Sequence, residues 1–506
     1  MRHEFDPFTE KETVEYYEEP AREIPVLDRV DVLVVGGSQS GVTAAISAAR
    51  HGSDVKLVER FGFLGGQSIY SMVVQWEKRA FINNLGAILT KGLPKEILDK
   101  ILEKGDSDRL WDTSPGCPEM RDGEEWLNPE AIKATLVEMC EEEGIDTLLH
   151  TKAVDTIVER QDELPKTTGV VFENKTGRFA IKADVIIDAT ADLDLVWDSI
   201  GEDGCKLRDP RERMHSGFYV WYGGVDNEKF IDWYVEESAA EGYPDPRKYP
   251  DKVLRHVREN KLIKIYGLPE IVAEAEEKGL MEKIDDIFSE VGREENIDLG
   301  MKWVGHDRWA VAFGIGVNML DAWELSKFES LRLKLVHYMI PILKLIPGWD
   351  DVHVSRDSVY IGSRETRVLK AEKVIDESVI GDPDNKDKPT PPDAIGRSGA
   401  HDPGKNRVDA GYPIPYGSLV PENLDGVVVC GRAVGTEFDQ ALNAHRGIVP
   451  SMVTGQGAGT AAALANQEGV ELRDVDTSKL QEVLREDGVQ LDHETYEFDF
   501  EIPEVD

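Results

Sequence analysis

A glycine-rich turn between an apolar strand and a small-residue helix constrains the fold of this chain most strongly. Residues 30–35 are a largely apolar run of strand length, and residues 36–41 read Gly-Gly-Ser-Gln-Ser-Gly. An Ala-rich helical segment follows at 42–50, and a second short strand is predicted at 55–59. This order of elements predicts a β-α-β unit with two parallel strands.

The same turn has the context of a dinucleotide-binding fingerprint. Gly36 permits a tight turn, Gly41 permits close packing of helix on strand, and the helix N-terminus offers N–H groups to a pyrophosphate. Glu59 follows Gly36 by 23 positions and ends the second strand, where a carboxylate accepts hydrogen bonds from ribose hydroxyls. Ser38 stands where the fingerprint has its second glycine. Its Cβ restricts the backbone, although its hydroxyl can donate to a phosphate.

Two further glycine-rich regions favour FAD over a nicotinamide dinucleotide. Residues 60–68 read Arg-Phe-Gly-Phe-Leu-Gly-Gly-Gln-Ser directly after the ribose-binding strand, and an extended FAD needs such close backbone approach. Residues 429–432 and the small-residue helix containing 455–459 can lie against a flat cofactor. A close helix–helix contact is the alternative explanation for 455–459. Since no histidine occurs in 64–68, we expect FAD to bind non-covalently.

Elsewhere the pattern predicts further elements. Asn128, Pro129 and Gly144 are start and stop signals for a helix over 129–143. Short β-rich runs in 145–188, separated by polar turns, predict an antiparallel meander that returns to a buried strand. Residues 303–309 are interpreted as a strand and 321–345 as an amphipathic helix.

These motifs, in this order, resemble the FAD-dependent oxidoreductase family that includes tricarballylate-dehydrogenase-like proteins and the flavin domain of the heterodisulfide reductases. The segments that carry the resemblance are 31–37, 59–66, 187–192, 362–367, 412–416, 430–433 and 454–462. The family usually has glycine at the positions of Ser38 and Ala191, and the cysteine ligands of its iron–sulfur members are absent here.

The resemblance implies an α/β fold: a Rossmann-like FAD-binding domain with a three-strand antiparallel meander and an inserted α+β substrate domain. The expected organisation is an N-terminal arm at 1–28, the first part of the FAD-binding domain at 29–204, a substrate or cap domain at 205–405, the C-terminal return of the FAD-binding domain at 406–470, and an acidic C-terminal tail at 471–506.

The candidate cofactor contacts come from the glycine-rich segments and from the segments that match the family. They are Gly36, Gly37, Ser38, Gln39, Ser40, Gly41, Glu59, Arg60, Gly65, Gly66, Gln67, Ala189, Thr190, Asp192, Gly431, Arg432, Gly455, Gly457 and Ala458.

A histidine and two arginines are the main catalytic candidates. His445 precedes the helix that the resemblance places beside the flavin, and a neutral imidazole there can accept a hydroxyl proton. A structural histidine bonded to a loop carbonyl is the alternative. Arg364 and Arg446 are candidates for binding a carboxylate or hydroxyl group, although arginines also neutralise nearby acidic side chains. Weaker candidates are Arg367, His306 and His401.

The charge and the cysteine content limit which binding partners and which cellular compartment we expect for this protein. The 58 basic and 98 acidic side chains give a net charge of −40, which disfavours nucleic acid and anionic membranes as partners. Because the charges are spread along the chain, we expect an acidic, salt-tolerant surface. Cys117, Cys140, Cys205 and Cys430 form no C-x-x-C pair, which favours a reducing cytoplasm and no metal site. Neither a secretory signal nor a membrane span is predicted.

These features together predict a cytoplasmic FAD-dependent dehydrogenase with a small-molecule substrate, while homo-oligomerisation stays open. It would transfer a hydride between a small polar metabolite, such as an organic acid or a sugar-like alcohol, and flavin N5. The alternatives are a nicotinamide-only dehydrogenase, a flavoprotein that uses FAD structurally or for isomerisation, and a flavin-bearing protein that docks an iron–sulfur partner. No hydrolase, metalloprotease or kinase motif is present.

Overall fold

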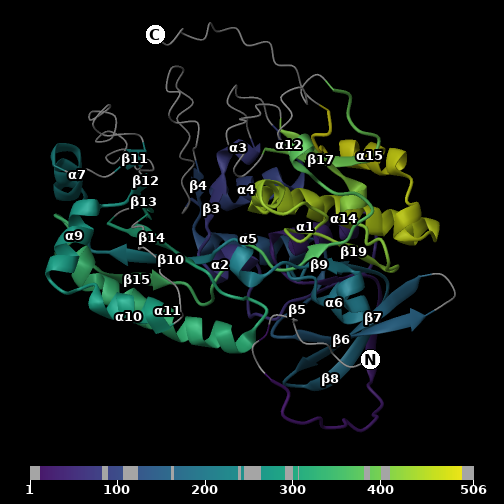
Figure 1. The fold of residues 1–506 in the computed structure, drawn as a ribbon. Helices are drawn as coiled ribbons and strands as arrows, with labels where there is room; N and C mark the ends of the chain where they lie inside the picture. The colour runs from purple at the N-terminus through teal and green to yellow at the C-terminus, as the bar shows by residue number, and fades with distance from the viewer. Residues whose placement is uncertain are drawn as a thin grey trace, which may run out of the picture.

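The computed structural model describes residues 9, 12–81, 89–105, 124–160, 164–237, 241–243, 264–290, 300–305, 307–380, 388–399 and 411–492. Figure 1 shows two lobes, one built around α1, α14 and the sheet beside them, the other around α7, α9, α10 and α11. Each lobe has its own cluster of buried apolar side chains. The predicted domain boundaries stay a prediction.

The larger lobe is built on a seven-stranded sheet in the order β5-β2-β1-β8-β7-β6, with β19 also paired to β8. β5, β2, β1, β8 and β19 are parallel, whereas β6, β7 and β8 form an antiparallel meander. The fold class and the β-α-β unit predicted from the sequence are therefore confirmed. The strands are β1 (Val26–Val35), β2 (Val55–Val58), β5 (Asp146–Leu148), β6 (Lys152–Arg160), β7 (Pro165–Asn174), β8 (Gly177–Asp188) and β19 (Val427–Val429).

Two helices of this lobe cross with their backbones in contact: α1 (Gln39–Arg50) and α14 (Ile448–Glu468). A Cβ on Gly455 would lie 2.2 Å from the carbonyl oxygen of Ser40, and one on Gly459 would lie 2.2 Å from that of Ala44. The Ser47 hydroxyl also donates to the Gln456 carbonyl at 3.1 Å. Only glycine allows this approach, so the small residues of α14 have a packing role.

Shorter elements complete the larger lobe. The helix predicted over 129–143 is α5, since the Asn128 side chain accepts from the Glu130 N–H at 2.8 Å and Gly144 has a φ of +68°. The other helices are α2 (Gly66–Tyr70), α3 (Lys78–Phe81), α4 (Leu93–Glu103), α5 (Pro129–Glu142), α6 (Asp194–Ile200), α12 (Glu377–Ile380), α13 (Gln440–His445) and α15 (Thr477–Glu486). Three two-stranded ladders pair β3 (Gln75–Glu77) with β4 (Glu124–Trp126), β9 (Cys205–Lys206) with β16 (Val368–Leu369), and β17 (Ala394–Ser398) with β18 (Tyr412–Pro415).

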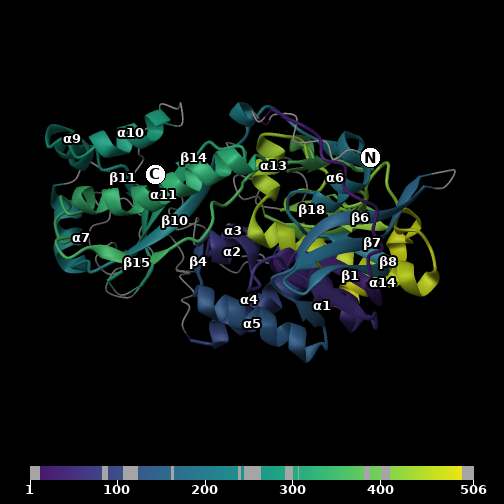
Figure 2. The same cartoon turned by 90° about the horizontal axis from the view of Figure 1, so that it is seen from below.

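The smaller lobe is an antiparallel six-stranded sheet in the order β11-β12-β13-β14-β10-β15, packed against helices (Figure 2). Trp303 and Trp309, expected on one strand over 303–309, instead pair with each other across the antiparallel strands β13 and β14, so that prediction was wrong. The expected helix over 321–345 is α11, capped by the Asp321 side chain. The elements are β10 (Ser216–Gly223), β11 (Glu241–Tyr243), β12 (Lys264–Tyr266), β13 (Gly300–Trp303), β14 (Trp309–Ile315), β15 (His353–Asp357), α7 (Asn227–Glu236), α9 (Pro269–Glu277), α10 (Glu282–Glu290) and α11 (Ala322–Leu343).

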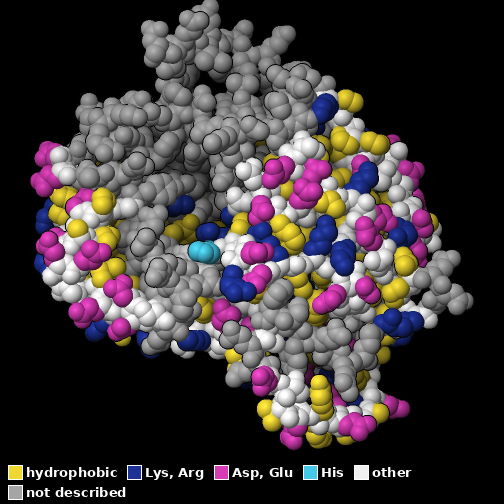
Figure 3. All heavy atoms as spheres, in the orientation of Figure 1, with side chains coloured by type: hydrophobic (Ala, Val, Ile, Leu, Met, Phe, Trp, Pro, Cys, Tyr) yellow, Lys and Arg dark blue, Asp and Glu magenta, His cyan; other side chains and the backbone are white. Residues whose placement is uncertain are grey.

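The described surface has mixed charge. On the face shown in Figure 3, Lys and Arg side chains lie among Asp and Glu side chains and single apolar groups. None of the helices in the described ranges is both long enough and apolar enough to cross a bilayer.

Candidate functional site

An open cavity lies at the carboxyl ends of β1, β2, β8 and β19. Ligands of open α/β sheets bind at this edge. Twelve of the predicted cofactor contacts line the cavity: Gly36, Ser38, Gln39, Ser40, Glu59, Arg60, Gly66, Gln67, Ala189, Thr190, Gly431 and Arg432. Arg446 lines it as well.

The glycine-rich turn brings the backbone close to the cavity. Gly36 has a φ of +112°, and a Cβ there would lie 2.2 Å from the Ala189 carbonyl oxygen. A Cβ on Gly41 would lie 1.9 Å from the Gly36 carbonyl oxygen. Any larger residue would therefore push α1 away from β1 and β8, and the first-turn N–H groups of α1 would no longer point at the cavity.

The two departures from the family's glycines have different consequences. Ser38 has an extended backbone with a φ of −69°, and its hydroxyl caps α1 by accepting from the Gly41 N–H at 3.5 Å. Ala191 has a φ of +69°, a left-handed conformation that disfavours any residue with a Cβ. The serine is thus unstrained, whereas the alanine is strained.

Glu59 lies at the end of β2 with only 6% of its surface exposed. Its two carboxylate oxygens accept from the backbone N–H groups of Gly37 at 2.6 Å and Phe61 at 2.7 Å. Burial nevertheless raises the pKa of Glu59. Those two bonds fix the orientation of the carboxylate, which keeps lone pairs for the hydroxyls of a ribose.

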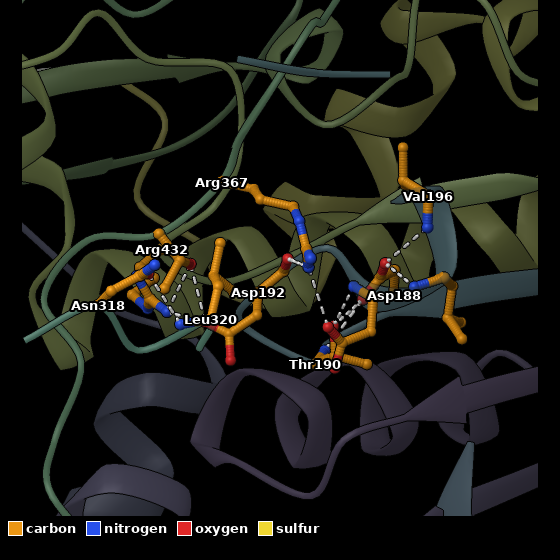
Figure 4. A network of polar contacts seen from close by, with 11 residues as sticks. Asp188, Thr190, Asp192, Val196, Asn318, Leu320, Arg367 and Arg432 are labelled. Atoms are coloured by element: carbon orange, nitrogen blue, oxygen red, sulfur yellow. Dashed lines mark hydrogen bonds and ion pairs between the residues drawn. The ribbon is translucent and has the colours of Figure 1, made fainter. Parts of the chain in front are cut away.

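A polar network holds the carboxyl end of β8 (Figure 4). Asp188 is buried, which raises its pKa, and it accepts from the hydroxyl and N–H of Thr190 at 2.6 and 3.0 Å. Arg432 and Arg367 converge on Asp192: Arg432 forms an ion pair with its carboxylate, and Arg367 donates to its carbonyl at 2.9 Å. Asp192, predicted as a cofactor contact, therefore positions Arg432 and does not line the cavity.

Seven predicted contacts lie outside the cavity lining: Gly37, Gly41, Gly65, Asp192, Gly455, Gly457 and Ala458. Gly37 and Gly65 shape the turns, since the Gly65 N–H donates to the Gly37 carbonyl at 2.8 Å, and Gly41 lies in α1 against the Gly36 carbonyl. Gly455 packs on α1, Gly457 packs on Ile395 of β17, and Ala458 is fully buried. Gly455 therefore takes part in the close helix–helix contact that was the alternative explanation, and cofactor contact by Gly455, Gly457 and Ala458 stays a prediction.

Several lining residues were not among the predicted contacts: Phe61, Tyr70, Thr151, Lys152, Ala153, Ala191, Asp194, Ile448 and Ser451. Residues 151–153 follow β5, which pairs in parallel with β2, so its carboxyl end lies beside Glu59. Ile448 and Ser451 belong to the first turn of α14. Both groups could have been predicted from the sequence, because one follows a predicted strand and the other begins a predicted helix.

His445 lies in the protein interior, with no exposed surface, and does not line the cavity. Its Nδ1 is 2.9 Å from the Tyr412 hydroxyl. Burial lowers the pKa of His445 to about 3, so the imidazole is neutral at neutral pH. This placement matches a packed histidine bonded to a tyrosine, and the role of His445 as a proton acceptor stays a prediction without a cavity contact to support it.

The arginine candidates differ in their surroundings. The Arg446 Nε and Nη2 donate to the Asn443 side chain at 3.0 and 2.8 Å. Arg367 stacks on Trp197, with its guanidinium carbon 4.4 Å from the ring centroid. Arg364 is half-buried and has neither a hydrogen bond nor an ion pair with any residue that the structure describes.

The other candidates are two histidines and the cysteines. His306, His401 and Cys117 lie outside the described residues. Cys140, Cys205 and Cys430 are buried free thiols. Within the described ranges, no three His, Cys, Asp or Glu side chains gather closely enough to hold a metal ion.

Comparison with known proteins gives a family match over most of the chain. A family model described as FAD dependent oxidoreductase matches residues 31–484. No curated protein matches this sequence. Similar solved structures include a geranylgeranyl bacteriochlorophyll reductase-like protein from Thermoplasma acidophilum, at 14% identity and a TM-score of 0.43 over 91% of this chain and 84% of that one. GidA from Aquifex aeolicus is 15% identical, with a TM-score of 0.46 over 88% of this chain and 64% of that one.

Proposed function

This chain belongs to the FAD-dependent oxidoreductase family, and we propose that it acts as a dehydrogenase of a small polar metabolite, either an organic acid or a sugar-like alcohol. The family match makes the chain an enzyme with FAD as its cofactor, so the nicotinamide-only alternative is set aside. When bound, FAD supplies a hydride acceptor or donor at N5 of its flavin ring. The substrate and the direction of transfer are parts of the proposal.

The residues of the cavity fit an extended dinucleotide. The first turn of α1, at Ser38 to Ser40, would hold the pyrophosphate through its N–H groups. Glu59 would accept from the ribose hydroxyls. Gly36 provides the close backbone approach that a Cβ would block. Non-covalent binding agrees with this set, which consists of hydrogen-bonding groups.

The observation that carries the proposal is that one cavity joins the nucleotide-binding turn to the guanidinium of Arg446. In a chain with a net charge of −40, a cation beside the cofactor provides local attraction for an anionic or hydroxylated substrate. Arg446 would attract such a group toward the flavin from its place beside the start of α14. Bringing the substrate close to the cofactor is a large part of what a protein contributes to hydride transfer.

The test is reduction of the bound flavin by candidate substrates without oxygen. Organic acids and polyols are added to the purified holoenzyme, and the yellow absorbance of oxidised flavin is followed. We expect one of these classes to bleach the flavin and Arg446→Gln to slow the bleaching. His445→Ala tests the other assignment, because unchanged bleaching would remove His445 from the role of proton acceptor.

The competing function uses FAD structurally or for isomerisation. The competing function would be supported if heating released FAD from the protein although no organic acid or polyol had bleached the bound flavin. That result would overturn the dehydrogenase proposal. Arg211→Gln is a matched control, because Arg211 is an exposed arginine paired with Asp209 outside the cavity.

A further inference from the structure

The central strands of the smaller lobe present two different faces. Phe218, Val220 and Tyr222 of β10 point into that lobe's own apolar core. Tyr219, on the opposite face, packs against the core of the larger lobe. Gly217 shares the face of Tyr219 because side chains two positions apart on a strand point the same way. The face that carries Gly217 and Tyr219 is called the inner face below.

The inner face adjoins the FAD cavity. The Tyr219 N–H donates to the Ser71 carbonyl at 3.0 Å, and Ser71 directly follows α2. Gly66, Gln67 and Tyr70, which belong to α2, line the cavity. A ligand on the inner face would therefore lie beside the segment that borders the cofactor.

Arg364 lies over the inner face. Its Nη2 is 3.5 Å from the position that a Cβ on Gly217 would occupy, so the glycine leaves room for the guanidinium. Neighbouring arginines are neutralised: Arg208 pairs with Glu365 and Arg432 with Asp192. Arg364 has no such carboxylate among the residues that the structure describes. A half-buried guanidinium without a protein partner is suited to bind an anion from outside.

The floor beside Arg364 carries almost no side chains. Gly314 of β14 pairs with Gly217, and Ala312 pairs with Tyr219. Gly314 is exposed, and no atom of the described residues lies within 4 Å of the position its Cβ would take. Among the described residues, the strand surface beside Arg364 is therefore open to a small ligand at Gly314.

Tyr219 presents an oriented hydrogen-bond donor. Its hydroxyl oxygen accepts from Gln75 Nε2 at 2.5 Å and from Lys302 Nζ at 3.4 Å. Lys302 is only 8% exposed, and its Nζ lies 5.5 Å from the centroid of the Tyr219 ring. Since two donors occupy the oxygen, the hydroxyl proton is left to donate, and no described residue accepts it.

We propose that the inner face is the substrate site, and that its ligand is a small carboxylic acid that carries a hydroxyl or oxo group. The Arg364 guanidinium binds the carboxylate with two parallel N–H donors. The Tyr219 hydroxyl donates to the oxygen of the second group, while Gln75 and Lys302 hold that hydroxyl in place. This inference deepens the proposed function because it names the substrate class. It rests on the proposed function only for the statement that the bound acid exchanges a hydride with the flavin.

The experiment measures binding to the oxidised holoenzyme, with two four-carbon acids that differ by one hydroxyl group. Malate and succinate are titrated by calorimetry and by the shift that they cause in the flavin absorbance. We expect malate to bind more tightly than succinate. Arg364→Gln should weaken both acids by about tenfold or more, since a charge-assisted pair is lost. Tyr219→Phe should weaken malate by about fivefold and leave succinate unchanged.

Further variants separate a binding defect from a folding defect. Arg364→Lys keeps the charge and should recover part of the affinity for both acids. Arg211→Gln removes the same charge from an exposed position and should leave both affinities unchanged. FAD content and far-UV circular dichroism are measured for every variant. If Arg364→Gln lost FAD, Arg364→Lys would be used in its place, and its affinity for both acids must then be lower than that of the wild type.

Three results would overturn the proposal: no binding of malate to the wild type, equal binding by Arg364→Gln, or an equal loss of both acids in Tyr219→Phe. These results differ from failure of the proposed function. If malate bound as expected and no compound bleached the flavin, the site would stand and the dehydrogenase proposal would fall. If another compound bleached the flavin of Arg364→Gln as fast as that of the wild type, the dehydrogenase proposal would stand and the inner face would not be the substrate site.

Discussion

The buried imidazole of His445 couples the stability of this protein to pH. In the folded protein burial lowers the pKa of His445 to about 3, against an ordinary value of 6.5. The unfolded chain therefore takes up a proton as the pH falls through about 6.5, and the folded protein does not. Stability from the neutral imidazole is complete above the unfolded pKa and is lost progressively as the pH falls toward the folded pKa.

The size of this effect follows from the two pKa values. Between about pH 7 and pH 5, proton uptake by the unfolded chain at this one residue lowers the free energy of unfolding by about 2 kcal/mol. The folded protein contributes almost nothing over that interval, because its pKa lies lower still. His445→Asn removes the titrating group and keeps a side-chain acceptor beside the Tyr412 hydroxyl.

The assay is urea unfolding of the holoenzyme at both pH values, followed by tryptophan fluorescence. Many carboxylates titrate as well, so the informative quantity is the pH-dependent loss in the wild type minus that in the variant. We expect that difference to be about 2 kcal/mol. His215→Asn, a change at an exposed histidine, is the matched control. Equal losses in the wild type and His445→Asn would refute the reasoning.

Three other expectations follow from the site. Gly455→Ala places a Cβ 2.2 Å from the Ser40 carbonyl oxygen, and should lower the free energy of unfolding by roughly 1–3 kcal/mol, measured by urea unfolding. Ala191→Gly relieves a φ of +69° and should raise the same quantity by up to about 1 kcal/mol, and a decrease would count against the strain. Burial raises the pKa of Glu59, so FAD retention measured by dialysis should weaken as the pH falls through a value above that of an ordinary glutamate. Glu59→Gln should show a flat profile over the same pH range, and a profile like that of the wild type would contradict the role of Glu59.

The parts of the structure predicted correctly depend on local pattern. The roles of Gly36 and Gly41 followed from a strand, a turn and a helix adjacent in the sequence. The lining position of Glu59 followed from its spacing. The meander followed from alternating runs and polar turns. In each case the residues that determine the structure lie close together along the chain, so one segment carried the whole signal.

The parts that escaped prediction depend on distant partners. Asp192 forms an ion pair with Arg432, which lies 240 positions away, and no residue near Asp192 in the sequence indicates that partner. Small residues on α14 suit either a cofactor or a helix, and the choice depends on where α1 lies. Tyr219 and Lys302 come from different strands and meet only when the sheet forms. The cytoplasmic location, the salt tolerance and the oligomeric state stay predictions.

The backbone contact between α1 and α14 also determines when the cofactor site can be completed during synthesis. Ser47 and Gln456, which meet there, are 409 positions apart in the sequence. Contacts between such distant residues form late because a long loop must close first, and domains generally fold in order as the chain emerges. The β-α-β unit is made first, yet its helix acquires this partner only when α14 is complete. A ribosome-bound chain that ends before residue 448 would have the phosphate-binding turn without the helix that packs on it, and should not retain FAD.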